Sequence, residues 1–292
     1  GFAMGKSLKL AIVGGDERQA YLARLAQADG HSIRTFALER AENVPRSPDL
    51  ASCLTGADAV LLPVPVTQGE NLLRAPLSDT KTDIMQVLDA IPSGTLTLGG
   101  AVPFRLHARA VQNGVRLTDC LAREELAIRN AVPTCEGALQ IAMEQTDRTI
   151  QGARALVVGA GRIGFLLAQR LHALGAEVTV SVRSLRDRAR IEAQGWTAVE
   201  TAKLAEVVPE MELIFNTVPA PVLTNDAMRA LLPPCIVIDL ASLPGGVAPD
   251  AEPAAGCRVL HALSLPGKVA PRSAAEAIYM TVTAILREEG LL

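Results

Sequence analysis

Three glycines between residues 155 and 168 carry the clearest chemical signal in this sequence. The segment reads Ala-Leu-Val-Val-Gly-Ala-Gly-Arg-Ile-Gly-Phe-Leu-Leu-Ala, an apolar run followed by glycines and an amphipathic stretch. Gly159 permits a tight turn, Gly161 lets a pyrophosphate approach the backbone, and Gly164 lets a helix pack closely on the strand. Because the amides at a helix start attract phosphate, the segment predicts a dinucleotide site. A glycine turn with a purely structural role is the alternative.

The residues around these glycines supply the rest of the unit that such a site needs. A helix is expected over Arg162–Leu174, Gly175 stands where a helix C-cap belongs, and Glu177–Val182 is typical of a second strand. Strand, glycine turn, helix and strand make a βαβ unit. The expected phosphate contacts are Gly159, Ala160, Gly161, Arg162, Ile163 and Gly164.

The end of that second strand indicates which dinucleotide is bound. An NAD site usually has an acidic residue there, about 20 residues beyond the glycines, which binds the adenosine ribose. This chain has Ser-Val-Arg-Ser-Leu-Arg over residues 181–186 and no acid. Guanidinium and hydroxyl groups suit the extra phosphate of NADP, so we expect NADP bound through Arg183, Ser184 and Arg186. Alternatively, the arginines are solvated charges at a helix start.

The composition is that of a globular protein with two domains. The 292 residues are 49% hydrophobic and 20% charged, and the net charge of −3 gives no reason to expect nucleic acid or an anionic membrane as partner. No apolar run is long enough to span a bilayer and no signal peptide is recognised, so we expect a cytoplasmic protein. The five cysteines lack a C-x-x-C pair and the four histidines are scattered, so no metal site is expected.

Strands alternate with helices along the first half of the chain. We expect a parallel sheet with helices on both faces, a complete doubly wound α/β domain. Its strands are predicted over Leu8–Val13, Ser32–Ala37, Asp58–Pro63, Thr95–Leu98 and Val115–Thr118, and its helices over Glu17–Ala28, Asp83–Ala90 and Phe104–Asn113.

The second half repeats this alternation after a helical connector. The connector is expected over Leu121–Thr146 with an interruption at Pro133, and a last helix, Ser273–Glu289, is expected to fold back onto the first domain. The later strands are predicted at Thr197–Val199, Leu213–Asn216, Ile236–Asp239 and Val259–Leu260. The fold class is therefore α/β, with two doubly wound Rossmann-like domains flanking a cleft. Their expected bounds are 5–132 (with 272–292 packing back) and 151–271, joined by a connector over 133–150.

Ligands of open α/β sheets bind beyond the carboxyl ends of the strands, so residues there are candidates for binding. In the second half we expect the cofactor to contact Thr217, Val218, Pro219, Asp239 and Ser242 as well. Asp239 could instead orient a neighbouring loop, and Ser242 could cap a turn.

Other strand ends and the connector supply groups that would bind a small substrate. The expected substrate contacts are Asp16, Arg18, Val64, Pro65, Thr67, Thr134, Ser242 and Lys268. Asp16 followed by Gln19 also fits a capping box at a helix start, and Arg18 and Lys268 could be solvated surface charges.

Several motifs more specific than the glycine fingerprint resemble those of one family. They are Gly-Gly-Asp-x-Arg-Gln over 14–19, Pro-Thr-x-Glu-Gly over 133–137, Asp-Leu-Ala-Ser over 239–242 and Leu-Pro-Gly-x-Val-Ala-Pro over 265–271. Together they make the chain similar, over nearly its whole length, to the family of dipicolinate synthase A subunits. The resemblance implies an NADP-linked enzyme of spore-forming bacteria, acting in the mother cell during sporulation with the smaller, flavoprotein-like B subunit of dipicolinate synthase.

The reaction implied by this resemblance forms pyridine-2,6-dicarboxylate from a dihydro or 4-hydroxy-tetrahydro precursor. Aromatisation removes a hydride and a proton, and the site must hold two carboxylates. The candidate catalytic residues are Arg18, Glu136 and Lys268, with Glu136 or Lys268 as proton donor if water is lost. Glu136 could equally hold the connector against a strand end. We also expect a homo-oligomer.

Two other interpretations stay open. An alanine or 2-hydroxy-acid dehydrogenase would share the two-domain cleft, but the sequence shows neither an acid at the end of the second strand nor a histidine after a late strand in a dehydrogenase-like context. The other is a non-catalytic subunit that only senses a nucleotide. Turnover with and without a second subunit would distinguish it from an enzyme.

Overall fold

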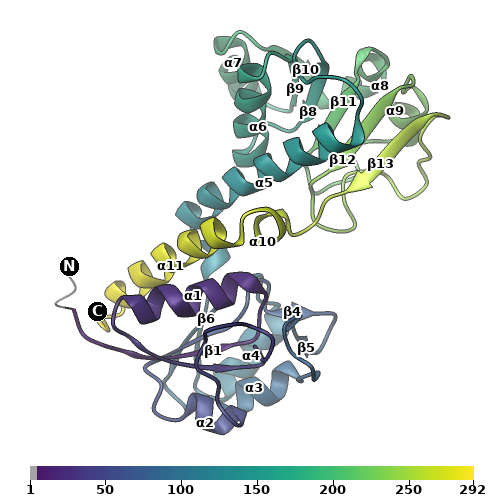
Figure 1. The fold of residues 1–292 in the computed structure, drawn as a ribbon. Helices are drawn as coiled ribbons and strands as arrows, with labels where there is room; N and C mark the ends of the chain where they lie inside the picture. The colour runs from purple at the N-terminus through teal and green to yellow at the C-terminus, as the bar shows by residue number, and fades with distance from the viewer. Residues whose placement is uncertain (1–4) are drawn as a thin grey trace. The chain divides into compact units, whose positions relative to one another are not determined.

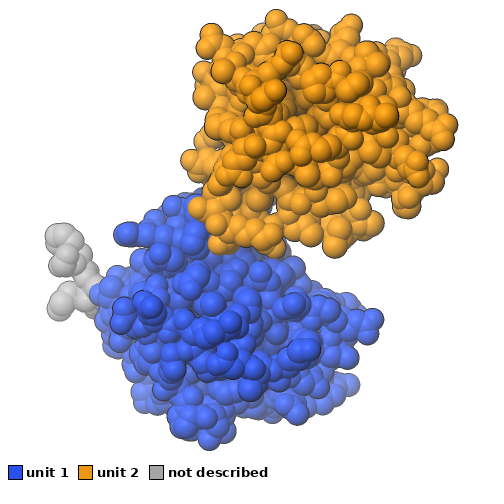
Figure 2. Space-filling model, turned by 45° about the vertical axis from the view of Figure 1, so that its right-hand side comes forward, with its two compact units in different colours: residues 1–130, 270–292 blue, residues 131–269 orange. Residues whose placement is uncertain are grey.

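The computed structural model describes residues 5–292 and divides into two compact units. Unit 1 takes the chain up to Asn130 together with Ala270–Leu292, and unit 2 is Ala131–Val269 (Figure 2). The chain therefore leaves unit 1 and later returns to it. Within residues 5–292, no helix is both long enough and apolar enough to cross a membrane.

Unit 1 is built on a five-stranded parallel sheet with the order β2-β1-β3-β6-β7. Figure 1 draws unit 2 in teal to yellow-green and labels β1 and β6 of the unit 1 sheet. Its strands are β1 Lys9–Val13, β2 Ser32–Phe36, β3 Ala59–Leu61, β6 Leu96–Gly99 and β7 Arg116–Asp119. Apart from a small hairpin, β4 Thr67–Gln68 with β5 Leu72–Leu73, this is the flavodoxin-like strand order. The sequence patterns do not predict this hairpin, because each of its strands is only two residues long.

Helices cover both faces of this sheet, because its strands are apolar on both sides. Leu10 and Ile12 of β1 pack with α1 and α11, whereas Ala11 and Val13 pack on the opposite face with α2, α3 and α4. The helices are α1 Glu17–Ala28, α2 Leu50–Leu54, α3 Ile84–Ala90, α4 Phe104–Gln112 and α11 Pro271–Glu288. The expected return of the last helix to the first domain is confirmed.

Unit 2 has a six-stranded parallel sheet with the order β10-β9-β8-β11-β12-β13, which is the Rossmann order. Its strands are β8 Arg154–Val158, β9 Glu177–Val182, β10 Thr197–Glu200, β11 Leu213–Asn216, β12 Cys235–Asp239 and β13 Cys257–His261. Helices α5 Glu124–Gln145, α6 Arg162–Ala173 and α7 Leu185–Ala193 pack on one face, and α8 Leu204–Val207 and α9 Asn225–Arg229 on the other. The α/β class with two doubly wound domains is confirmed.

The expected break at Pro133 is wrong, since α5 runs through the proline as one helix. A proline removes one helical hydrogen bond, but the helix on both sides of it is fixed by tertiary packing. Cys135, Ala138 and Ala142 are fully buried in the unit 2 core and hold the helix in place beyond this position. Short 3₁₀ turns complete the fold at Cys120–Ala122, Thr201–Lys203 and Val208–Glu210.

Residues Leu265–Val269 form the short helix α10, which packs on α5 at Gly137. A Cβ atom at Gly137 would lie 2.9 Å from Val269 Cγ2 and 3.1 Å from Leu265 Cβ, so only glycine lets α10 pack this closely. The glycine of the Pro-Thr-x-Glu-Gly motif is thereby explained by packing.

Candidate functional site

The glycine fingerprint has the geometry expected of a dinucleotide turn. Gly159 has φ of 100°, and a Cβ there would lie 2.6 Å from Thr217 Oγ1. A Cβ at Gly164 would overlap the carbonyl oxygen of Gly159. Gly161, by contrast, has no atom within 4 Å of the Cβ position. Packing therefore requires the first and third glycines, whereas the second faces open space.

Gly161 is also the N-cap of α6, and no side chain caps that helix start. The first amides of a helix lack intrahelical partners and attract anions. The open space at Gly161 and the uncapped amides are the two features that a pyrophosphate needs, so the residues present fit a dinucleotide.

Hydroxyl groups fix this turn to the neighbouring strands. The amide of Gly159 donates to Ser181 Oγ at 3.2 Å, and Ser181 is fully buried. Thr217 Oγ1 donates to the carbonyl of Val158 at 2.7 Å, and Thr201 Oγ1 lies 3.4 Å from Ser181 Oγ. Ser181 and Thr201 were not singled out from the sequence. The one signal for Ser181 is a lone hydroxyl in an apolar strand, and Thr201 has no such signal.

A cavity of about 630 Å³ opens at the carboxyl ends of β9 and β10. Its lining includes Arg183, Glu200, Thr201, Thr224 and Asp226. This is the edge of a Rossmann sheet where the adenosine half of a dinucleotide lies. The structure thus brings Arg183 to the cavity, together with an acid on the adjacent strand, Glu200, that the sequence pattern did not single out.

The other two residues expected to bind the extra phosphate of NADP are placed differently from Arg183. Ser184 is the N-cap of α7 and its Oγ accepts from the amide of Asp187 at 3.1 Å, so its hydroxyl has a structural partner. Arg186 is exposed and does not line the cavity. A further cation, Arg190, lies beside the fingerprint instead: its guanidinium is 4.6 Å from the Phe165 ring centroid and 3.5 Å from the carbonyl of Ala160.

Asp239 at the end of β12 organises the far side of the same sheet edge. Its fully buried carboxylate accepts from Asn216 Nδ2 at 3.0 Å, from the Ala241 amide at 3.1 Å and from the Gly246 amide at 2.8 Å. A Cβ at Gly246 would overlap the Asn216 amide. The carboxylate orients the loop after β12, the alternative raised from the sequence, and its contact with a cofactor stays a prediction.

The residues around Asp239 occupy the strand ends as expected. Thr217, Val218 and Pro219 follow β11, and Ser242 is exposed in the turn after β12, where its carbonyl accepts from the Gly245 amide at 2.8 Å.

His261 corrects one sequence-based expectation, namely that no histidine follows a late strand. Strand β13 runs one residue further than predicted, and its parallel register places His261 opposite Asp239. His261 Nδ1 lies 3.6 Å from Asp239 Oδ2, and the histidine side chain is 46% exposed.

In unit 1, Asp16, Arg18 and Val64 come together at the carboxyl edge of the sheet. Asp16 caps α1 by accepting from the Arg18 amide at 3.0 Å, and it pairs with Arg18 Nε at 3.0 Å and with Arg74 Nη1 at 2.9 Å. Arg18 also donates to the carbonyl of Val64. Burial alone would raise the pKa of Asp16, but hydrogen bonds from Arg18 and Arg74 and the charge of Arg18 hold it below its ordinary value.

Arg74 was missed because it is 58 residues from Asp16 in the sequence. Two guanidinium groups share one carboxylate here, so the three side chains together carry one net positive charge. The capping box is only half formed, since Gln19 Nε2 donates to the carbonyl of Leu61 at 3.2 Å instead of returning to the helix start.

The remaining candidates are divided between the units. Pro65 and Thr67 lie in unit 1, where Val64–Pro65 is a cis peptide bond and Thr67 begins β4. Thr134 is buried on α5, whereas Glu136 on α5 and Lys268 on α10 of unit 2 are exposed. Glu136 is next to Gly137, where those two helices meet.

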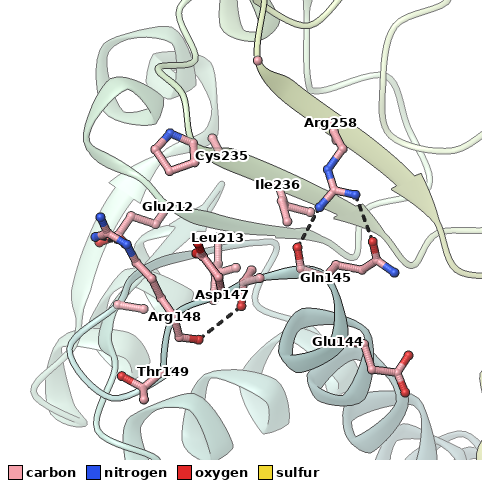
Figure 3. Close-up of a pocket in the computed structure, with 14 residues that line it drawn as sticks. Glu144, Gln145, Asp147, Arg148, Thr149, Glu212, Leu213, Cys235, Ile236 and Arg258 are labelled. Atoms are coloured by element: carbon pink, nitrogen blue, oxygen red, sulfur yellow. Dashed lines mark hydrogen bonds and ion pairs between the residues drawn. The ribbon is translucent and has the colours of Figure 1, made fainter.

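A second cavity of about 380 Å³ lies at the amino ends of the unit 2 strands and is not part of this site (Figure 3). Its arginines are already engaged: Arg258 donates to the Gln145 carbonyl at 2.7 Å and to Gln145 Oε1 at 2.9 Å, and Arg148 lies 3.6 Å from Glu212. Ligands of a parallel α/β sheet bind at the carboxyl ends of its strands, the edge opposite to this cavity.

Two family models match the chain. Residues 9–121 match the N-terminal domain of the dipicolinate synthase A subunit, and residues 140–262 match shikimate / quinate 5-dehydrogenase. The second match covers all six strands of the sheet that carries the fingerprint. Together with the fold, it makes the chain an oxidoreductase of the dehydrogenase type and supports a nicotinamide cofactor.

Individual relatives match over nearly the whole length. The dipicolinate synthase A subunit of Bacillus subtilis (strain 168) is 32% identical over 291 residues, 96% of each chain. The crystal structure of this synthase's A chain from Bacillus subtilis has a TM-score of 0.86 at 30% identity, covering 99% of this chain and 98% of that one. The A-subunit structure from Bacillus halodurans has a TM-score of 0.85 at 27% identity, covering 96% and 97%. By sequence and by structure, the chain belongs to the family of dipicolinate synthase A subunits.

Proposed function

We propose that this chain is an NADP-linked oxidoreductase that forms pyridine-2,6-dicarboxylate from a dihydro or 4-hydroxy-tetrahydro precursor. The observation that carries the proposal is the fingerprint turn, where Gly161 faces open space at an uncapped helix start. When bound, the oxidised nicotinamide would accept a hydride. The residues proposed to hold the dinucleotide are Gly159, Ala160, Gly161, Arg162, Ile163, Gly164, Arg183, Thr217, Val218 and Pro219.

The proposed substrate carries two carboxylates, and unit 1 offers a cationic group for one of them. Arg18 and Arg74 place two charges against the single carboxylate of Asp16, so a substrate carboxylate would balance the excess. The carbonyl of Val64 helps to hold the Arg18 guanidinium in place. Contributions from Lys268 and Glu136 stay predictions.

Arg183 is proposed to recognise the extra phosphate of NADP. NADPH should bind more tightly than NADH by about 2 kcal/mol, roughly 30-fold, because NADH cannot make the charge-assisted contact. Arg183→Asp should reverse this preference, since an acid at the end of β9 would repel the phosphate and accept from the ribose of NADH. Fluorescence titration with both nucleotides measures the two affinities.

Arg188→Asp is the matched control for that variant. It makes the same charge change on α7, but Arg188 pairs with Glu192 at 3.3 Å and does not line the cavity. The control should therefore keep the preference for NADPH. Equal affinities of the unmodified chain for NADPH and NADH would contradict the NADP assignment.

The reaction itself is best tested with a second protein present, because the relatives are named as one part of a synthase. We propose a flavoprotein-like partner, the B subunit of the synthase, with the pair acting in the cytoplasm of the mother cell during sporulation. The mixture should convert the precursor to dipicolinate faster than the sum of the separate proteins, followed by the ultraviolet absorbance of the aromatic ring. A chain that binds NADPH but never yields dipicolinate, with or without the partner, is a nucleotide-sensing protein instead.

A further inference from the structure

We infer that His261 accepts the proton released in the oxidation, an inference that rests on the function proposed above. The histidine closes β13 at the carboxyl edge of the unit 2 sheet, the edge that also carries the glycine fingerprint. Its side chain is 46% exposed, so a ligand can reach the ring. Its Nδ1 faces a carboxylate that water cannot reach, because Asp239 is fully buried.

The pairing of these two residues follows from the sheet. Strands β12 and β13 are parallel neighbours, and their register sets Asp239 directly opposite His261. The separation of 3.6 Å between Nδ1 and Oδ2 is longer than a hydrogen bond but within the reach of an ion pair. A histidine with one nitrogen facing a carboxylate presents the other nitrogen, Nε2, for proton transfer.

The hydrogen bonds of Asp239 leave one position for the histidine. A carboxylate offers about four lone-pair sites. Oδ1 accepts from Asn216 Nδ2 and from the Ala241 amide, while Oδ2 accepts from the Gly246 amide. The remaining site on Oδ2 is within reach of His261. The three donors hold the carboxylate rigid, so it can fix the orientation of the imidazole and stabilise its positive charge.

The position of His261 along the sheet suits a reacting group. The Arg183 cavity, proposed for the adenosine half, lies at β9 and β10, and the fingerprint follows β8. The second half of a dinucleotide continues past this point across the sheet edge, toward β11 and β12. His261 ends the next strand, about 14 Å from β8 at the usual strand spacing. It therefore lies on the nicotinamide side of the site.

The proton balance of the reaction requires such a group. When a dihydropyridine dicarboxylate becomes aromatic, one ring C–H bond breaks and its electron pair leaves as hydride to the oxidised nicotinamide dinucleotide. An adjacent ring C–H bond then breaks and its electrons complete the aromatic ring, or the N–H bond of the pyridinium breaks and its electrons stay on nitrogen as the lone pair. The proton goes to Nε2 of His261, Asp239 offsets the charge of the imidazolium, and the proton passes from the exposed ring to water.

The first test uses turnover by the full chain with its cognate partner. His261→Gln and His261→Ala should each lower kcat by about 100-fold or more, the usual loss for a general base, with NADPH affinity unchanged. Added imidazole should restore part of the activity of His261→Ala but not that of His261→Gln, where the glutamine fills the space. His172→Gln is the matched control, since His172 is exposed on α6 of the same unit and should leave kcat unchanged.

The second test needs no turnover. The chain has four histidines, so ¹⁵N-labelled imidazole signals can be assigned with His261→Gln and followed while dipicolinate is added to the NADP-bound wild type. The His261 signals should shift and those of His172 should not. Full activity of both His261 variants, or an unmoved His261 signal while dipicolinate binds, overturns the inference. If the wild type neither turns over nor binds dipicolinate, the proposed function fails with it.

Discussion

Gly164→Ala should destabilise unit 2 and abolish dinucleotide binding. The new Cβ would overlap the carbonyl oxygen of Gly159, a backbone atom that cannot move without opening the turn after β8. Overpacking of this kind costs about 1–3 kcal/mol, which corresponds to a fall in Tm of about 2–12 °C. Thermal unfolding followed by circular dichroism, together with titration of NADPH, measures both effects.

Gly161→Ala is the matched variant, since the same methyl group at this position meets no atom within 4 Å. Its stability should change by less than about 1 kcal/mol, the range for an exposed N-cap substitution. NADPH affinity should nevertheless fall by about 10-fold or more, because the methyl group occupies the space in front of the α6 amides. A Gly161→Ala chain with wild-type affinity would show that the pyrophosphate binds elsewhere.

Asp239→Ala should have an equally large effect on stability. The substitution removes the acceptor of the Ala241 and Gly246 backbone amides and one of the two acceptors of the Asn216 side-chain amide, which keeps its bond to the Val218 carbonyl. A buried donor without a partner costs about 1–3 kcal/mol, so the three lost hydrogen bonds together should cost about 3 kcal/mol or more. For a unit of this size the expected fall in Tm is about 6–12 °C.

Asp250→Ala is the control, because Asp250 is an exposed residue of the same loop region. Its Tm should stay within about 2 °C of the wild type, as for most surface substitutions. If Asp239→Ala were as stable as this control, the carboxylate would not be what holds the loop after β12 in place.

The dinucleotide unit could be predicted closely because its signals are local. The strand expected over Glu177–Val182 has those bounds in the structure, and the helix expected from Arg162 begins there. The glycines of the turn and the apolar runs of the strands determine the structure of residues close to them in the sequence. A single short stretch of sequence is therefore enough to recognise the unit. The parallel, doubly wound form of both sheets followed from the alternation of strands with helices.

The contacts that complete the site could not be predicted in the same way. Arg74 reaches Asp16 across 58 residues, and Ser181 meets Gly159 across 22. Neither pairing produces a periodic pattern in the sequence, because each pairing depends on which strand ends become neighbours in the folded sheet. His261 was overlooked for a smaller reason: β13 extends one residue beyond the apolar pair Val259–Leu260, and that residue is the one set opposite Asp239.

The return of α11 to unit 1 has a consequence for how the protein is made. Residues 131–269 leave the ribosome before residues 270–292, so all of unit 2 is available while unit 1 still lacks a helix. Until that helix arrives, the face of α1 on which α11 packs is exposed to solvent. The unit that starts first in synthesis is therefore the one that finishes folding last, and it is the one that chaperones would need to protect.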